Sequence, residues 1–149
     1  MTLIHVSAWL MAVCGGLFSG AILIVAVERV NLWRRMPTAQ YVVDFRRSLY
    51  RSDPLIPIMG GLSASAAVVY ALHSHDRSAV MAWIGVALIA VIMLASIVVA
   101  EPMNSKFRRL PEGQAPAGVE QLRIAWRRFH FVRTGLALAA LACLTAAVA

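Results

Sequence analysis

Four long apolar runs limit the folds that this chain can adopt. They cover residues 3–27, 54–73, 78–100 and 130–149. A transmembrane helix needs about 20 apolar residues to cross a hydrocarbon core that is roughly 30 Å thick. The runs therefore predict membrane-spanning helices at about residues 3–27, 54–73, 78–100 and 120–149, the last one preceded by a more polar first part. We expect a single all-α domain over residues 1–149, an antiparallel four-helix transmembrane bundle.

The composition supports this class and excludes others. Hydrophobic residues make up 60% of the chain and charged residues 14%, whereas a soluble domain has about 45–50% and about 25%. A small soluble fold cannot bury so much apolar surface. The net charge of +7 does not indicate nucleic acid, because the basic residues stand in blocks between the apolar runs and form no basic face on a soluble module.

The basic blocks predict the orientation in the membrane. Every Lys and Arg except Arg77 lies in residues 28–53, in residues 101–129 or at Arg133. Because Lys and Arg are retained on the cytoplasmic side, both long connections are expected in the cytoplasm. Both termini and the short turn at residues 73–77 then lie outside, in a bacterial-type inner membrane or a plasma membrane.

The two long connections differ in character. In the first, apolar residues recur at helical spacing after Thr38, which predicts a short amphipathic helix lying in the membrane interface, its arginines toward lipid phosphates. The apolar residues are Tyr41, Val42, Phe45 and Leu49. In the second, prolines and glycines from Pro102 to Gly118 predict a break with a flexible tip. A helix is expected to restart near Val119 and to continue into the last apolar run.

Five polar residues near the predicted cytoplasmic helix ends are candidates for chemistry, because ionisable groups at membrane depth are costly. They come from three helices and fall in one layer: Glu28, Glu101, Asn104, His130 and Arg133. Each also has a structural interpretation. Arg133 can extend to the headgroups with His130 beside it, Glu28 can pair with Arg29, and Glu101 can be a solvated helix end.

Two kinds of chemistry fit this layer. Glu28, Glu101 and His130 are predicted metal ligands, since Glu and His from facing helices build metal sites in bundles; such oxygen-rich ligation favours iron or manganese over copper. Alternatively, His130 is a general base and Arg133 stabilises a developing anion, with Asn104 beside them.

Small residues repeat at spacing that allows close helix packing, as in Ala12, Gly16 and Gly20, and in Gly135 and Ala139. They predict close helix contacts within the bundle or in a homo-oligomer. Asp53 and Pro54 are predicted to begin the second membrane helix, as N-cap and first helical residue.

Short motifs give the chain a family resemblance. They are Glu28-Arg29 at the end of the first run, Phe45-Arg46-Arg47 before Asp53-Pro54, Pro102-Met103-Asn104, and Trp126 followed by His130-x-x-Arg133-Thr134. With them the chain resembles the anthrone-oxygenase-like family of small four-helix membrane proteins.

The resemblance implies oxidation of anthrone-type polyketides to anthraquinones with molecular oxygen. Asn104, His130 and Arg133 match the family's polar positions, and Glu28 and Glu101 are expected to line the same cavity. A base removes the benzylic proton, and the anion reacts with oxygen directly or at a metal. The implied cofactor is a non-haem metal, iron or copper, or none, with molecular oxygen as co-substrate.

The sequence therefore predicts a membrane oxygenase with a polar site near the cytoplasmic face, acting on a small hydrophobic aromatic substrate. The alternative is a non-catalytic subunit or stabiliser of a larger membrane complex. A small multidrug-type transporter is disfavoured because the acids stand at helix ends rather than deep within a helix.

Overall fold

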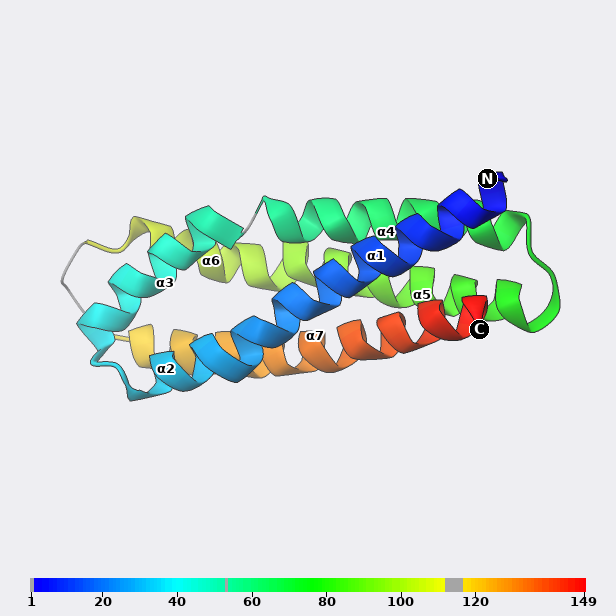
Figure 1. The fold of residues 1–149 in the computed structure, drawn as a ribbon. Helices are drawn as coiled ribbons and strands as arrows, with labels where there is room; N and C mark the ends of the chain where they lie inside the picture. The colour runs from blue at the N-terminus through cyan, green and yellow to red at the C-terminus, as the bar shows by residue number, and fades with distance from the viewer. Residues whose placement is uncertain (1, 53, 112–116) are drawn as a thin grey trace.

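The chain forms four long helical rods that run antiparallel to one another (Figure 1). The structure, a computed structural model, describes residues 2–52, 54–111 and 117–149. Its elements are α1 (Leu3–Ile24), η1 (Val25–Arg29), α2 (Val30–Arg35), α3 (Thr38–Ser52), α4 (Leu55–Leu72), α5 (Asp76–Ala95), η2 (Ser96–Ala100), α6 (Glu101–Arg109) and α7 (Val119–Val148). The two η segments are π-helical.

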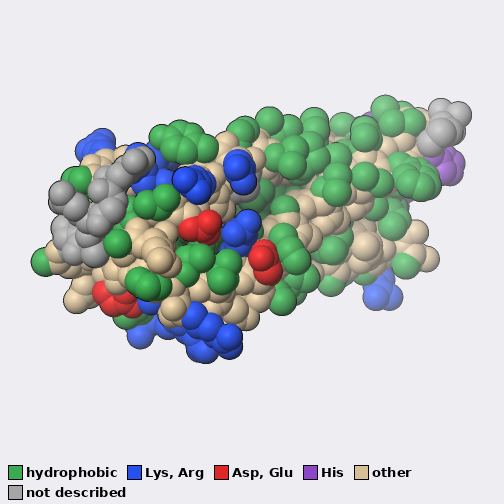
Figure 2. All heavy atoms as spheres, turned by 60° about the vertical axis from the view of Figure 1, so that its left-hand side comes forward, with side chains coloured by type: hydrophobic (Ala, Val, Ile, Leu, Met, Phe, Trp, Pro, Cys, Tyr) green, Lys and Arg blue, Asp and Glu red, His purple; other side chains and the backbone are tan. Residues whose placement is uncertain are grey.

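Four helices in the described part of the chain are long and apolar enough to cross a membrane, as predicted: Leu3–Arg35, Leu55–Leu72, Asp76–Arg109 and Val119–Val148. Both termini and the α4–α5 turn lie at one end of the bundle, and α2, α3 and α6 lie at the other (Figure 1). Charged side chains gather at this second end, while hydrophobic side chains cover most of the remaining length (Figure 2). We call the second end the basic end.

Two of the rods are longer than predicted. The first continues without interruption through Glu28 to Arg35, and the third continues through Pro102 to Arg109. The predicted break begins later than expected, after Arg109. Pro102 does not interrupt the helix because it is the second residue of α6, directly after the π-helical turn, where a helix tolerates the missing N–H. The predicted restart at Val119 is confirmed, and α7 runs from there through the bundle as one helix.

Side chains that bond to the backbone of a neighbouring helix help to hold the spans together. Ser19 Oγ donates to the carbonyl of Ala137 (2.9 Å), Ser63 Oγ to that of Met11 (2.9 Å), and the Tyr70 hydroxyl to that of Ala147 (2.8 Å). In lipid such bonds contribute about 0.6–2 kcal/mol each. They fix α1 against α4 and α7, and α4 against α7.

Gly85 allows α5 to pack closely against α7. A Cβ atom added there would lie 2.5 Å from Cδ2 and 2.8 Å from Cγ of Leu144. We expect Gly85→Ala to destabilise the protein by about 1–3 kcal/mol, the usual cost of overpacking a core. Gly61→Ala is the matched control, because nothing lies within 4 Å of an added Cβ there. Thermal unfolding in detergent measures both variants, and an equal midpoint for the two would contradict the prediction.

Helix α3 is amphipathic as predicted, but its apolar face is covered by protein rather than by lipid. Tyr41, Val42 and Phe45 are at most 1% exposed. They pack with Trp33 of α2, Phe107 of α6 and Trp126 of α7. The ring of Phe45 lies 4.5 Å from that of Phe107 and 4.9 Å from that of Trp126. Helix α3 therefore acts as a cap that joins three helices at the basic end.

The Tyr41 hydroxyl is buried in this cap without a hydrogen-bond partner. Burial raises the pKa of Tyr41 above its ordinary value of roughly 10, although Arg123 over its ring opposes the shift. At high pH this tyrosine ionises more readily in the unfolded chain than in the folded protein. The free energy of unfolding is therefore fully present below pH ~10 and falls as the pH rises further. We expect Tyr41→Phe to be as stable as the wild type, or more so, at pH 7, and its advantage to grow between pH 9 and 11 in denaturation experiments. A constant or shrinking difference would contradict this expectation.

The structure does not test some of the other sequence predictions. Asp53 and residues 112–116 of the predicted tip lie outside the described residues. Gly16, Gly20 and Gly135 have open space where a Cβ would lie. Homo-oligomerisation through these small residues stays a prediction.

Candidate functional site

A cavity of about 490 Å³ lies at the basic end of the bundle. Its wall is mainly apolar and aromatic, with Phe18 and Ile22 of α1, Trp33 of α2, Phe45 of α3 and Trp126 of α7. Polar side chains also line it, among them Ser96 of η2, Glu101, Asn104 and Arg108 of α6, and Arg133 of α7. Size and lining are typical of a small-molecule site, in which a few polar groups orient a largely apolar ligand.

Arg133 is a cation on this apolar wall. One of its terminal nitrogens, Nη2, lies 2.9 Å from Nδ1 of His130, and Nη1 lies 3.5 Å from Oγ of Ser96. Its guanidinium also sits over the ring of Phe129, 5.8 Å from the centroid. Arg133 and His130, three residues apart in the sequence, are thus in direct contact on one face of α7. A half-buried guanidinium in a low-dielectric cavity is suited to binding an anion.

His130 lies behind the wall, 0% exposed, and is not one of the residues that line the cavity. Because a guanidinium can only donate, Nδ1 accepts the bond from Arg133. Nε2 then carries the hydrogen and donates to the carbonyl of Ile22, 3.1 Å away. The ring of Trp126 stacks on the imidazole, with centroids 4.8 Å apart and planes 8° apart.

Asn104 lies opposite, on α6, and is 7% exposed. Its Oδ1 accepts a hydrogen bond from Nε1 of Trp126 at 3.1 Å. Trp126 therefore joins the amide of Asn104 to the imidazole of His130. Sequence reasoning noted Trp126 only as part of a family motif and missed this role. Its position four residues before His130, on the same helix face, was the available signal.

Both π-helical segments contribute to the site, and no sequence pattern predicted them. The Ile22 carbonyl that accepts from His130 lies in the turn before η1, and the Ser96 hydroxyl near Arg133 begins η2. A π-helical turn interrupts the regular i to i−4 bonding, so that backbone and side-chain groups around it can bond elsewhere. Such turns are frequent at functional sites.

The two predicted glutamates are not equivalent in the structure. Glu101 lines the cavity, accepts a short hydrogen bond from Arg108 and lies 3.3 Å from the Ser105 hydroxyl. Glu28 does not line the cavity; it is 57% exposed and pairs with Arg29 at 3.4 Å. The structure thus brings together Glu101, Asn104 and Arg133 around the cavity, with His130 behind them, and leaves Glu28 outside.

The residues present do not fit the expected metal site. Within residues 2–52, 54–111 and 117–149, no three His, Cys, Asp or Glu side chains form a group that could hold a metal ion. Both ring nitrogens of His130 are engaged by Arg133 and Ile22. Glu28 pairs with Arg29 and does not line the cavity. A metal held by Glu28, Glu101 and His130 would need all three contacts to break.

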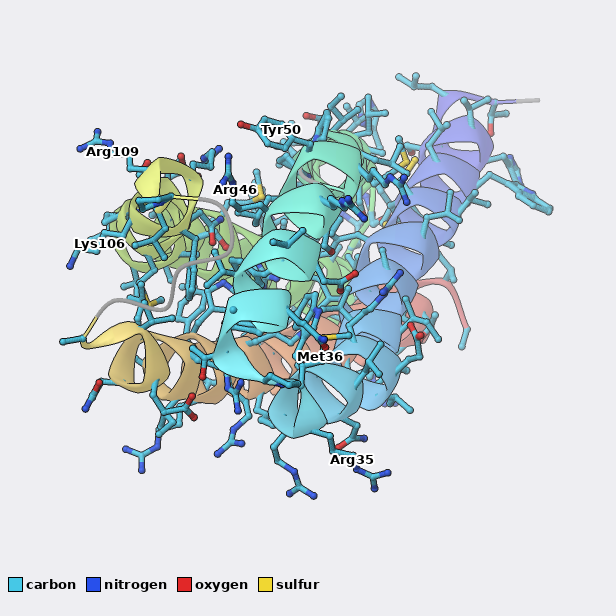
Figure 3. All side chains as sticks on the ribbon, turned by 90° about the vertical axis from the view of Figure 1, so that its left-hand side faces the viewer. Arg35, Met36, Arg46, Tyr50, Lys106 and Arg109 are labelled. Atoms are coloured by element: carbon cyan, nitrogen blue, oxygen red, sulfur yellow. The ribbon has the colours of Figure 1, made fainter. Side chains whose placement is uncertain are left out.

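Four other basic residues at this end do not line the cavity. In the end-on view, Arg35, Lys106 and Arg109 point away from the helices (Figure 3). Arg46 instead lies between α3 and α6 and donates to the carbonyl of Leu110 at 3.1 Å (Figure 3). The basic end therefore combines an outward-facing positive surface with a largely apolar cavity.

Fold and site together define an integral membrane four-helix protein with a cation-bearing apolar cavity at one end of the bundle. The family model described as anthrone oxygenase matches residues 45–143, which include α4, α5, α6 and most of α7. The chain belongs to the anthrone oxygenase family. No significant match is found among curated proteins or among solved structures.

Proposed function

We propose that this protein is a membrane oxygenase that oxidises the benzylic CH₂ of a flat, apolar aromatic ketone of the anthrone type with molecular oxygen. One observation carries the proposal: the Arg133 guanidinium lies on the wall of an otherwise largely apolar cavity. There it can bind the oxygen atom on which negative charge develops when the ketone loses a C–H proton. The family to which the chain belongs supports the same reaction class.

The proposed reaction is R₂CH₂ + O₂ → R₂C=O + H₂O. A base removes one C–H proton, and the resulting enolate gives one electron to O₂. The substrate radical and superoxide then combine to form the C–O bond of a peroxide, which takes up a proton. Loss of the second C–H proton breaks the O–O bond and expels hydroxide, which leaves as water. The carbon loses four electrons and O₂ gains four, so no further oxidant is required.

Glu101 is the proposed base. It is the one acid among the described residues that line the cavity, and its carboxylate is held by Arg108 and Ser105. Its partial exposure, 51%, connects the proton to water. His130 is a weaker candidate, because its acceptor nitrogen is already bonded to Arg133 and its ring lies behind the wall.

The cavity wall also suggests how an apolar substrate arrives. Tyr50 and Ile97 line the cavity and are 68% and 64% exposed, so the wall reaches the outer surface between α3 and η2. In a bilayer this surface faces lipid or the headgroup layer. We further propose that the basic end is cytoplasmic, following the positive-inside rule, so that a substrate dissolved in the inner leaflet reaches the cavity from the side.

Oxygen uptake by the purified protein tests the proposal. With anthrone as the probe and ¹⁸O₂ as the gas, we expect one O₂ consumed per anthraquinone formed and one ¹⁸O atom in the new carbonyl group. Activity should survive exhaustive dialysis against a chelator, since no step is assigned to a metal. Loss of activity, with recovery when iron or copper is added, would show that the reaction needs a metal. No uptake above the protein-free rate would overturn the proposed function.

The second candidate is a non-catalytic membrane subunit. It is favoured by Gly16 and Gly20 of α1 and Gly135 of α7, which leave open space on the bundle surface where another helix could approach closely. Tight co-purification with a different membrane protein, together with no oxygen uptake, would support this candidate over the oxygenase.

A further inference from the structure

His130 is the most completely enclosed polar side chain of the site, yet the proposed reaction gives it no bond to make or break. It is 0% exposed, its two nitrogens have defined partners, and its ring face is covered by Trp126. A general base needs a lone pair directed at the substrate. Here the acceptor lone pair is directed at Arg133 and the other nitrogen at a backbone carbonyl.

We infer that His130 is a positioning residue that orients the Arg133 guanidinium toward the substrate anion. This inference rests on the proposed function. It says which residue gives the cavity its preference for anionic ligands. The acceptor is Nδ1, 2.9 Å from Nη2 of Arg133. As a neutral acceptor, the imidazole orients the guanidinium without adding a charge of its own.

The imidazole is itself held from two sides. Its Nε2 donates to the Ile22 carbonyl before the π-helical turn of α1, which fixes the tautomer and the ring orientation. Trp126 covers its face and is anchored in turn by Asn104 on α6. Three helices thus determine where the guanidinium points. Such support is what a binding group needs to stay in its productive geometry.

Two substitutions of nearly equal shape separate the positioning role from a base. His130→Asn places its Oδ1 near the position of Nδ1 and so keeps an acceptor for Arg133, but it has no group that can act as a base. His130→Leu has the same branched shape without an acceptor. We expect His130→Leu to lower kcat by about 10–100-fold, the worth of a hydrogen bond to a charged group, and His130→Asn to recover most of that loss.

A binding measurement gives a readout that a merely structural role would not move. The probes are anthracene-9-carboxylate and its uncharged carboxamide, compared by the ratio of their Kd values. The wild type and His130→Asn are expected to prefer the carboxylate, and His130→Leu to lose the preference while still binding the carboxamide. Equal loss for both probes, or an inactive His130→Asn in a folded protein, would overturn the positioning role.

A measurement on the wild type keeps the inference testable if the variants do not fold. In protein carrying ¹⁵N-labelled histidine, the NMR signal of His130 is expected to show a neutral ring with hydrogen on Nε2 and an accepting Nδ1. A hydrogen on Nδ1 would overturn the positioning role.

Arg133→Met separates this inference from the proposed function. If Arg133→Met loses turnover and anion preference while His130→Leu keeps both, only the positioning role fails; if Arg133→Met keeps both, the proposed function fails.

Discussion

Replacing Arg133 with Met is expected to lower kcat/KM for oxygen uptake with anthrone by about 10²–10³-fold, the usual loss when one donor to a developing oxyanion is removed. Met has a similar length and fills the space without a charge. The cavity keeps its apolar wall of Phe18, Ile22 and Phe45, so binding of the neutral ketone should weaken little. The loss should therefore appear mainly in kcat, measured from initial rates of oxygen uptake.

Arg133→Lys is the matched control, because it keeps the charge but loses the planar fork that contacts His130 and Ser96. We expect an intermediate rate for this variant. Wild-type activity in Arg133→Met would contradict the role of the guanidinium. A loss in Arg133→Met carried by KM alone would show that Arg133 binds substrate without stabilising the anion.

Replacing Glu101 with Gln is expected to lower kcat by about 10²–10⁴-fold, the usual contribution of a general base. The amide has the shape of the carboxylate and cannot accept the C–H proton. The pair with Arg108 would weaken as well, but this pair is partly exposed, and such pairs contribute little to stability. Protein yield and unfolding midpoint should therefore change little while turnover is lost.

Glu28→Gln is the control for Glu101→Gln. Glu28 stands at the basic end as Glu101 does, yet it pairs with Arg29 and does not line the cavity. We expect it to retain wild-type turnover. A large loss in Glu28→Gln would indicate that both glutamates act together, as the predicted metal site requires, and equal activity in both variants would remove Glu101 as the base.

The fold was predictable because its main determinants are local in sequence. Runs of about 20 apolar residues specify spans, and the basic blocks separate the two ends of the bundle. The three-residue spacing of His130 and Arg133 placed them on one face of α7, as observed. The pattern of Tyr41, Val42 and Phe45 predicted an amphipathic helix, but amphipathicity does not tell whether lipid or protein covers the apolar face.

The composition of the site was less predictable, because it depends on helix phase and on contacts between distant residues. The π-helical turn at Val25–Arg29 changes the rotation per residue just where Glu28 stands, so ideal helical spacing does not give the direction of its side chain. Arg29 pairs with Glu28 and also with Asp44 of α3 at 3.5 Å, so the Glu28 carboxylate has a partner outside the cavity. Sequence spacing alone did not predict the pair of Arg29 with Asp44.

An anaerobic spectral titration tests the central claim most directly, because it observes the substrate anion without any turnover. Anthrone and its enolate absorb at different wavelengths, and without O₂ the bound species persists. At neutral pH we predict that anthrone bound to the wild type shows the enolate spectrum and that anthrone bound to Arg133→Met shows the ketone spectrum. A ketone spectrum in the wild type at saturation would contradict the assignment of the cavity as an anion-stabilising oxygenase site.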